Sequence, residues 1–571
     1  MAQIGVFVDA MKGSIPSPFR ERMTALVQQL PNIAFVQEEE NLISPEGLEG
    51  MAKRLEAAGT DRVVIVGGSP KAYEASFHKW GHSLSLNPYL FAIANIREQA
   101  LWVMPDEDSA LEKAKSIITK VLRFASNSRS IEAQSINLKP EVLVIGGGVV
   151  GISVALALGR SGIHVSLLEK SGDLGGRARE LRRFYNRPEE VQRWIEEKTA
   201  ETYGSKNITL FTRSELKRLE GHLGRFQARI QGPGETETTL FPSAIVVASG
   251  YDARQEATGI YSHRRVIPLS KMESLLFETQ GPRLLLDGKK AETVTFLLDR
   301  VNEDIKVDSI NAVKQALSLQ EAFDCQVAVL CRDVKVAADG MERLYRKARE
   351  KGVLFIKYED PPRLSIVDGR IQVDVKDPAA IQKKEPWPVS ILSDFVVVSE
   401  AFMPGPETEG LAGILKIHLG ARGFLMEDNP QFLRVRSNRR GIFVAGACRF
   451  PQEISESLIE ARAVAQEVIA LLSKGAYAYD LAIAEVDPKK CAVCYTCPRL
   501  CPHSAITVEK YAEKNVYVTS GSPAETKWSA AKVDPAACYG CGICVAECPA
   551  KAITLHHETT DQIYAQMNLM E

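Results

Sequence analysis

The chain has 571 residues, with 70 Lys and Arg against 72 Asp and Glu, which gives a formal net charge of −2 at pH 7. At about 100–200 residues per domain, this length predicts three or four domains. The balanced charge argues against a nucleic-acid binder, which carries a basic excess. No apolar run approaches the ~18 residues of a membrane span, and the first residues lack the pattern of a secretion signal. We therefore expect a cytoplasmic protein without a nucleic-acid partner.

The first 125 residues have the pattern of a small α/β domain. Short apolar runs bounded by glycine, typical of buried parallel strands, alternate with segments of helical periodicity. The predicted strands are 4–8 and 63–66, and the predicted helices are 47–58 and 108–123. Residues 126–140 are polar and aperiodic, which indicates a linker. Because the first cysteine of the chain is Cys325, we expect that residues 1–125 hold no cluster ligand.

A glycine-rich turn follows the linker and connects a strand to a helix. The expected elements are a strand at 141–145, a helix at 152–158 and a strand at 164–168. In this context the motif G-x-G-x-x-G predicts a dinucleotide site. Gly146 permits a tight turn, Gly148 lets the backbone approach a pyrophosphate, and Gly151 lets the helix pack closely on the strand. The helix N-terminus offers N–H groups to the phosphates, and Glu169 would accept hydrogen bonds from a ribose; a turn without a ligand is the alternative.

Three later segments resemble flavoprotein sequences, in the order found in reductases built from two dinucleotide-binding domains. They are Gly175-Gly176-Arg177, the strand that leads to Ala248 and Gly250, and the strand that leads to Gly446 and Cys448. This resemblance implies FAD in preference to NAD, with these residues at the cofactor and no catalytic side chain among them. It also implies an α/β fold like that of thioredoxin reductase. The FAD-binding domain would comprise 141–290 and 376–474, with a degenerate nucleotide-binding-like domain at 291–375 between its two parts.

The nucleotide-binding-like domain lacks the glycines that a second dinucleotide site needs. A predicted strand at 293–299 runs into Arg300-Val301-Asn302-Glu303-Asp304, where a pyrophosphate would require glycines and free N–H groups. Two carboxylates there would repel it, so we expect that neither NADH nor NADPH reduces the flavin directly. A redox dithiol is also missing, since Cys325 and Cys331 are more typical of thiols packed in a core.

Eight of the eleven cysteines lie between Cys491 and Cys548 and form two runs with the same spacing. Each run reads C-x2-C-x2-C-x3-C-P, the pattern of bacterial two-cluster ferredoxins, in which the fourth cysteine binds the other cluster. One [4Fe–4S] cluster would take Cys491, Cys494, Cys497 and Cys548, and the other would take Cys538, Cys541, Cys544 and Cys501. Zinc is the alternative, but zinc would need only paired C-x2-C motifs. We therefore expect residues 475–571 to form a ferredoxin-like α+β domain with two clusters.

The order of these segments resembles the A subunit of heterodisulfide reductase and the flavoprotein subunits of quinone-interacting oxidoreductases, over almost the whole chain. The resemblance rests on residues 68–70, 94–103, 345–353, 445–448 and 456–457. Members of this family often carry cysteines where Gly68 stands and near Ala100, and this chain has none there. Members thought to bifurcate electrons have a lysine in a Gly-Pro-Lys-Asp-Ile segment, where this chain has Gln452. The missing lysine argues against bifurcation.

FAD exchanges electron pairs whereas each cluster carries one electron, so a chain with both can connect the two kinds of donor. We expect an oxidoreductase subunit that relays electrons between flavin, clusters and partner subunits. The partners that the resemblance implies are other iron–sulfur or flavin subunits, a ferredoxin, a hydrogenase- or dehydrogenase-linked subunit, or a quinone-linked membrane subunit; a homodimer stays open. Two alternatives are an NAD(P)H-dependent flavin oxidoreductase resembling the glutamate-synthase small subunit, and a structural subunit without redox function. The missing glycines disfavour the first, and the complete set of cofactor ligands disfavours the second.

Overall fold

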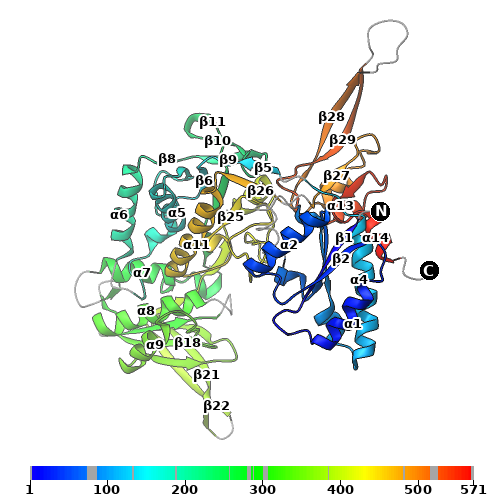
Figure 1. Cartoon of the computed structure of the whole chain (residues 1–571). Coiled ribbons are helices and arrows are strands. Elements are labelled where there is room, and N and C mark those ends of the chain that lie inside the picture. The colour runs from blue at the N-terminus through cyan, green and yellow to red at the C-terminus, as the bar shows by residue number, and fades with distance from the viewer. Residues whose placement is uncertain are drawn as a thin grey trace. The chain divides into compact units, whose positions relative to one another are not determined.

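The computed structural model of the chain divides into two compact units (Figure 1). Unit 1 joins Met1–Ser135 to Ala478–Glu571, and unit 2 is Ile136–Tyr477. The residues described are 3–73, 87–131, 134–186, 190–255, 258–279, 284–286, 289–299, 306–323, 325–382, 385–479, 482–514 and 525–567. Strands β5 (Gln134–Asn137) and β26 (Ala476–Tyr479), through which the chain passes from one unit to the other, pair with each other.

A four-stranded parallel sheet in the order β2-β1-β3-β4 forms the N-terminal part of unit 1. Its strands are β1 (Ile4–Asp9), β2 (Ile33–Glu39), β3 (Arg62–Gly67) and β4 (Phe91–Asn95), and its helices are α1 (Ser17–Val27), α2 (Pro45–Ala58) and α4 (Glu107–Ser126). The strands predicted at 4–8 and 63–66, and the helices predicted at 47–58 and 108–123, are confirmed. Ala110, Ala114, Ile118 and Leu122 follow one another every four residues and form the buried face of α4, as helical periodicity requires.

The C-terminal part of unit 1 is built from two strand pairs and three short helices. Its elements are β27 (Ala484–Val486) with β30 (Ile553–Leu555), β28 (Ile506–Lys514) with β29 (Glu525–Val533), α12 (Thr496–Leu500), α13 (Ile543–Ala546) and α14 (Thr560–Met567). Helix α14 packs against α4. Gln562 and Ser128, both buried, are joined by a 3.4 Å hydrogen bond from Nε2 to Oγ. The His557 ring lies edge-on to the ring of Phe124, with 5.4 Å between their centres. The two ends of the chain thus fold into one unit.

The first half of unit 2 contains a five-stranded parallel sheet in the order β25-β12-β6-β7-β8. Its strands are β6 (Glu141–Ile145), β7 (His164–Leu168), β8 (Ile208–Phe211), β12 (Ala244–Val247) and β25 (Ile442–Val444). Helix α5 (Val149–Arg160) packs against α6 (Val191–Gly204) and α11 (Ile454–Leu472). An antiparallel sheet of β9 (Glu215–Glu220), β10 (Gln227–Gln231) and β11 (Glu237–Leu240) and the helix α10 (Thr408–Leu415) complete this half. The predicted strand–turn–helix–strand at 141–168 is confirmed.

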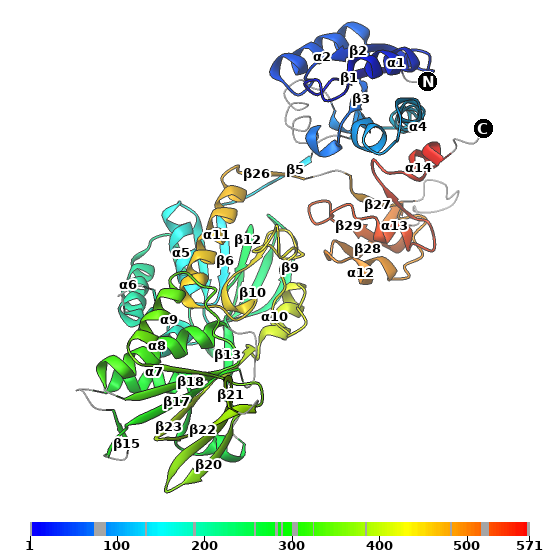
Figure 2. The ribbon, with the colours of Figure 1, turned by 90° about the horizontal axis from the view of Figure 1, so that it is seen from below.

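A second five-stranded parallel sheet, in the order β14-β23-β17-β18-β19, forms the other half of unit 2 (Figure 2). Its strands are β14 (Val266–Pro268), β17 (Thr293–Leu297), β18 (Gln326–Cys331), β19 (Leu354–Lys357) and β23 (Phe395–Val398). Helices α7 (Leu269–Glu278), α8 (Lys306–Ala322) and α9 (Met341–Glu350) belong to it, as do the antiparallel strands β20 (Arg363–Val367), β21 (Arg370–Gln382) and β22 (Glu385–Ser393). The strands β13 (Tyr251–Arg254) and β24 (Ala401–Pro404) pair between the two halves.

This second sheet takes strands from both sides of the range 291–375 that is predicted for the nucleotide-binding-like domain. β14 precedes that range and β23 follows it, and both hydrogen-bond within the sheet. β14 has only three residues, and the apolar run of β23 indicates a buried strand without indicating which sheet the strand joins. The two parallel sheets confirm the predicted α/β class.

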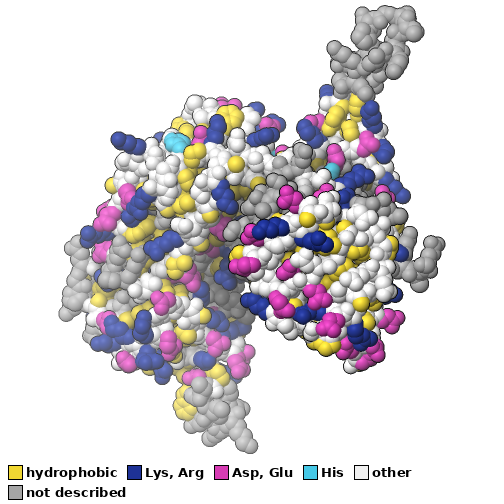
Figure 3. All heavy atoms as spheres, viewed as in Figure 1, with side chains coloured by type: hydrophobic (Ala, Val, Ile, Leu, Met, Phe, Trp, Pro, Cys, Tyr) yellow, Lys and Arg dark blue, Asp and Glu magenta, His cyan; other side chains and the backbone are white. Residues whose placement is uncertain are grey.

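Figure 3 shows Lys and Arg side chains intermixed with Asp and Glu over the visible faces of both units, in keeping with the near-zero net charge. Among the residues described, no helix is both long enough and apolar enough to span a bilayer.

Candidate functional site

The turn between β6 and α5 brings backbone segments into close contact at two of its glycines. Gly146 has a φ of +105°, and a Cβ there would lie 2.3 Å from the carbonyl oxygen of Ala248. A Cβ on Gly151 would lie 1.8 Å from the carbonyl oxygen of Gly146. A Cβ on Gly148, in contrast, would meet no heavy atom within 4 Å beyond its chain neighbours. The fold therefore needs the first and third glycines, while the middle one, at the N-terminus of α5, faces space that a phosphate could occupy.

Glu169, directly after β7, is buried against this turn with 7% of its surface exposed. Its Oε2 accepts a hydrogen bond from the Gly147 backbone N–H at 2.6 Å. Its Oε1 accepts from the Ser171 N–H at 2.7 Å and from the Ser171 hydroxyl at 2.8 Å. These donors fix the carboxylate in one orientation, and an ionised carboxylate has further lone pairs for ribose hydroxyls.

A cavity of about 230 Å³, here called the main cavity, begins at the turn and extends to helices α7 and α8. Eight of the residues predicted to bind the cofactor line it: Gly146, Gly148, Glu169, Gly175, Gly176, Arg177, Ala248 and Gly250. Gly175 is held beside the turn because its N–H donates to the Gly147 carbonyl oxygen at 2.8 Å. The structure thus brings together residues that lie far apart in the sequence.

The other three predicted residues, Gly151, Gly446 and Cys448, are not among those lining the main cavity. Gly446 lies against α5, where a Cβ would be 2.6 Å from Cγ2 of Val150. Cys448 is buried in the core, with its Sγ 3.1 Å from the Ala445 carbonyl oxygen. Burial raises the pKa of the Cys448 thiol to about 12, so it is a packed thiol and not a reactive one. Whether it touches a bound cofactor stays a prediction.

A second cavity of about 290 Å³, here called the side cavity, adjoins the main cavity at the same turn. Gly146, Glu169, Lys170 and Ser249 line both cavities, and the side cavity continues along β9 to α10 with Leu216, Leu411 and Ile414 on its wall. The turn at Gly146 and the carboxylate of Glu169 therefore have one compartment on each side. An elongated dinucleotide has this form, with a pyrophosphate in the middle and a ring system at each end.

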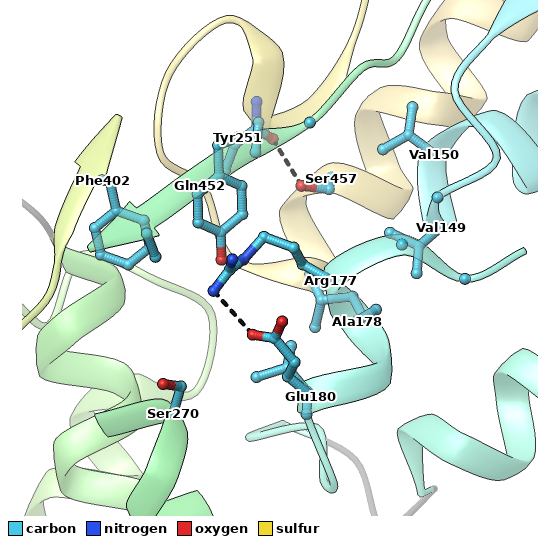
Figure 4. Close-up of a pocket in the computed structure, with 18 of the residues that line it drawn as sticks. Val149, Val150, Arg177, Ala178, Glu180, Tyr251, Ser270, Phe402, Gln452 and Ser457 are labelled. Carbon is cyan, nitrogen blue, oxygen red and sulfur yellow. Dashed lines mark hydrogen bonds and ion pairs between the residues drawn. The ribbon is translucent and has the colours of Figure 1, made fainter. Parts of the chain in front are cut away.

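Arg177 brings a guanidinium group to the wall of the main cavity (Figure 4). Its Nη2 donates to Glu180 at 2.8 Å, and its Nη1 lies 3.5 Å from Oδ1 of Asp252. Its guanidinium carbon lies 5.4 Å from the centre of the Tyr251 ring, and that ring is 5.1 Å from the ring of Phe402. Two carboxylates and an aromatic face thus hold the guanidinium in place.

Sequence reasoning found Gln452 only as a departure from a family pattern, yet the structure places it on the cavity wall. Its Nε2 donates to Glu460 at 3.0 Å, and its Oε1 accepts from the Ser457 hydroxyl at 3.3 Å (Figure 4). Arg449, with 2% of its side chain exposed, pairs with Glu460 and with Glu427. The amide is therefore fixed from behind by a buried ionic network. No local motif signals this network, because its members come together only in the tertiary fold.

Four residues that line the main cavity each have a buried polar atom without a hydrogen-bond partner among the residues described. These atoms are Nε of Arg177, Oγ of Ser249, Oδ2 of Asp308 and Oε1 of Gln315. Buried polar atoms in folded proteins are almost always matched. Together with the open space at Gly148, these atoms fit a cavity that holds a large polar ligand such as FAD.

The eight cysteines of the C-terminal part line two small cavities of about 20 Å³ each. One is lined by Cys491, Cys494, Cys497 and Cys548, and the other by Cys501, Cys538, Cys541 and Cys544. In each set the fourth cysteine comes from the other run, which is the grouping that the repeated spacing predicts. Four thiol groups around one space are the donor set of a [4Fe–4S] cluster.

Backbone N–H groups support these sulfur atoms in a repeated manner. Sγ of Cys501 accepts from the Ala505 N–H at 3.3 Å, and Sγ of Cys548 accepts from the Ala552 N–H at 3.3 Å. Burial and the neighbouring thiols raise the pKa of Cys544 to about 12, so a metal bound there would have to displace a proton. No set of three described His, Cys, Asp or Glu side chains is arranged around a single metal ion; a cubane spreads its four ligands over four irons.

The turn after β17 in the second parallel sheet is the place where the sequence predicts that the glycines of a nucleotide site are missing. Arg300, Glu303 and Asp304 lie outside the described residues. Cys325 and Cys331 lie in the hydrophobic core of this half, as packed thiols would. Burial raises the pKa of Cys331 to about 12.

Comparisons with known proteins match both the cysteine-rich C-terminal part and the segment that contains the glycine-rich turn. The family model described as a 4Fe-4S dicluster domain matches residues 486–552, and that of an NAD(P)-binding Rossmann-like domain matches residues 144–206. The A subunit of the ferredoxin/F420H2-dependent CoB-CoM heterodisulfide reductase of Methanosarcina acetivorans is 26% identical, with 85% of this chain and 73% of the relative covered. A protein of Archaeoglobus profundus named for its likeness to the heterodisulfide reductase A subunit is 25% identical, with 90% and 92% covered. The chain resembles the A subunit of heterodisulfide reductase along most of its length.

This likeness to the heterodisulfide reductase A subunit confirms the resemblance predicted from the sequence. Among solved structures, the thioredoxin reductase of T. acidophilum aligns with 58% of this chain and 99% of its own, at 15% identity and a TM-score of 0.40.

Proposed function

We propose that this chain is an FAD- and iron–sulfur-containing electron-transfer subunit of a heterodisulfide-reductase-like complex. The observation that carries the proposal is one chain with a dinucleotide-shaped pair of cavities and two cavities lined by four cysteines each. The relatives that share most of the chain are named as heterodisulfide reductase subunits. Both lines of support indicate an oxidoreductase.

The main cavity and the side cavity would hold one FAD between them. When bound, FAD would supply the exchange of electron pairs for single electrons. The N-terminus of α5 at Gly148 would bind the pyrophosphate, and Glu169 would accept hydrogen bonds from the adenosine ribose. Arg177, already fixed by Glu180 and Asp252, would bring a positive charge to the flavin end of the main cavity.

The two cysteine cavities would each hold one [4Fe–4S] cluster, two in total. Backbone N–H groups directed at Cys501 and Cys548 would stabilise the negative charge that a cluster gains on reduction. Cys494 and Cys541 are exposed, which gives a partner protein access to both clusters. We infer redox partner subunits of iron–sulfur or flavin type and a cytoplasmic location, with any membrane contact made through a partner. With Gln452 in place of a lysine, the subunit would relay electrons without bifurcating them.

Anaerobic reduction of the full-length reconstituted chain tests this proposal. We expect about one FAD and about eight irons per chain, with prompt bleaching of the flavin and cluster absorbance by a reduced viologen. Stoichiometric flavin with fewer than about four irons, or iron without flavin, would contradict it.

The second candidate is an NAD(P)H-dependent flavin oxidoreductase. The observation that favours it is the second parallel sheet of unit 2. The same preparation decides between the two. Rapid flavin bleaching by stoichiometric NADH or NADPH in stopped-flow absorbance would support the reductase, because hydride transfer needs a clamped nicotinamide. Slow or absent bleaching by both nucleotides, with prompt reduction by the viologen, would support the relay.

A further inference from the structure

Asp308 is a buried carboxyl group on the wall of the main cavity that the polypeptide does not fully satisfy. It lies in the first turn of α8 with 3% of its surface exposed. Its Oδ2 has no hydrogen-bond partner among the residues described. Leaving a buried polar atom unmatched is costly. The unmatched Oδ2 therefore indicates a hydrogen-bond partner that the chain itself does not supply.

The charged groups that act electrostatically on Asp308 are carboxylates. Glu400 accepts hydrogen bonds from the Ser270 N–H at 3.0 Å and from the Ser270 hydroxyl at 3.1 Å, and Asp299 accepts from the Arg332 N–H at 2.8 Å. Burial first, and then Glu400 and Asp299, raise the pKa of Asp308 well above its ordinary value. These surroundings favour the neutral form of the carboxyl group, and a neutral carboxyl group is an O–H donor.

Two lysines of α8 and the arginine of the cavity wall are paired with other carboxylates. Lys314 pairs with Glu273 at 2.9 Å, Lys306 pairs with Glu456, and Arg177 pairs with Glu180 at 2.8 Å. Glu273, like Asp308, lines the main cavity, but it is matched by Lys314, by Gln315 Nε2 at 3.1 Å and by the Arg182 N–H at 3.1 Å. Among the described acidic residues that line the main cavity, Asp308 thus differs in having a buried oxygen without a partner.

The arrangement of the two cavities indicates which part of an FAD would lie beside Asp308. With a pyrophosphate at Gly148 and a ribose at Glu169, the adenine of an FAD would extend into the side cavity, which Glu169 also lines. The flavin half would then extend into the main cavity, whose far wall carries Asp308. A flavin ring offers several acceptor atoms and a single N–H donor, so a donor on the wall is the complementary group.

We propose that Asp308 donates a hydrogen bond from its carboxyl group to the flavin ring, so that the nucleotide-binding-like half of unit 2 completes the flavin site. This inference rests on the proposed function. A reduced flavin ring carries more negative charge than an oxidised one, and a hydrogen bond to a charged acceptor is the stronger kind. Asp308 therefore favours the reduced ring and raises the reduction potential of the flavin.

Spectroelectrochemical titration of the full-length chain tests the inference with three variants. D308N keeps a donor of the same shape, D308L removes it, and D333L makes the same change at an exposed carboxylate of the same half that does not line the main cavity. In D308L we expect the ratio of oxidised to reduced flavin affinity to rise about tenfold, which a two-electron couple registers as a fall of about 30 mV. D308N should shift by less than a third of that, and D333L should match the wild type.

The outcomes separate this inference from the function on which it rests. A wild-type chain that retains no FAD would contradict the proposed function itself. A wild-type chain with FAD whose potential is the same in D308L, even where D308L unfolds at a lower temperature, would show Asp308 to be a structural carboxyl group only.

If D308L retains no FAD, the pH dependence of the potential decides. As pH rises through the ionisation of Asp308, the wild type loses its donor and gains a negative charge at the ring, so its potential should fall more steeply than that of D308N. Coincident curves for the two proteins would overturn the inference.

Discussion

Replacing Cys501 by alanine should remove the cluster from the cavity that is lined mainly by the run of cysteines beginning at Cys538. Cys501 belongs by sequence to the run that begins at Cys491, but it lines the cavity of Cys538, Cys541 and Cys544. The variant removes one of the four thiols in that cavity and none from the cavity of Cys491. A [4Fe–4S] cluster with three cysteine ligands is incomplete, so we expect that cluster to be lost and its neighbour to remain.

Pairs of substitutions give the magnitude without any need to tell the two clusters apart. C501A alone should lower the iron content from about eight to about four per chain. C501A/C538A removes two ligands of the same cavity, so it should lower the count no further, whereas C501A/C491A should leave almost none. Substitutions that act on one unit are non-additive, and those on separate units add. C331A, at a buried cysteine outside both cavities, should keep all the iron.

Iron and acid-labile sulfide are to be measured on anaerobically purified full-length protein, with the flavin content as a check on folding. If each run of cysteines held its own cluster, the two double variants would exchange places: C501A/C491A would keep about four irons and C501A/C538A would keep almost none. That result would refute the grouping read from the cavities.

Three further outcomes follow from unit 2. G148V should fold but lose FAD, because its side chain would enter space free of protein atoms, whereas G151V should fail to fold because Cβ would lie 1.8 Å from a carbonyl oxygen; bound flavin and circular dichroism distinguish them. E273A should lower the free energy of unfolding by about 3–5 kcal/mol, because the largely buried ammonium group of Lys314 would lose its carboxylate partner. Burial alone would raise the pKa of Glu273, but the ion pair and hydrogen bonds lower it overall. The stabilisation by Glu273 is therefore present above the ordinary carboxyl pKa and is lost as pH falls through the pKa of Glu273 in the folded protein. Denaturant titrations at several pH values would show this loss. Cys448, with its pKa raised to about 12, should resist iodoacetamide near pH 8 in the folded protein; rapid labelling seen by mass spectrometry would contradict its burial.

Local patterns predicted those parts of the molecule whose chemistry depends on residues that lie close together in the sequence. The turn at 146–151 could be placed because a strand, three spaced glycines and a helix follow one another directly. The grouping of Cys501 with Cys538 could be predicted because the repeated spacing is a rule about which ligand crosses over. Both depend on residue type and spacing, which a sequence displays.

The far wall of the main cavity could not be predicted in this way. Asp308 and Gln315 reach the cavity on a helix that lies more than 130 residues beyond the turn, and Gln452 is held there by Glu460 and Arg449. Nothing in the neighbouring residues marks them, because their role is created by tertiary packing. For the same reason the three-residue strand β14 escaped prediction, since its place is fixed by pairing with β23.

The joining of both ends of the chain in unit 1 has a consequence for biosynthesis. Helix α4 leaves the ribosome long before its neighbour α14, so the buried contact between Ser128 and Gln562 must wait until all of unit 2 has been made. Unit 2 lies between the two parts in the sequence and can complete its sheets while the C-terminal segment is still being translated. Domains fold as they emerge, N-terminal segments first; here the earlier part of unit 1 waits for the later part. A nascent chain that stalls after unit 2 would therefore present an unfinished N-terminal surface to chaperones and proteases.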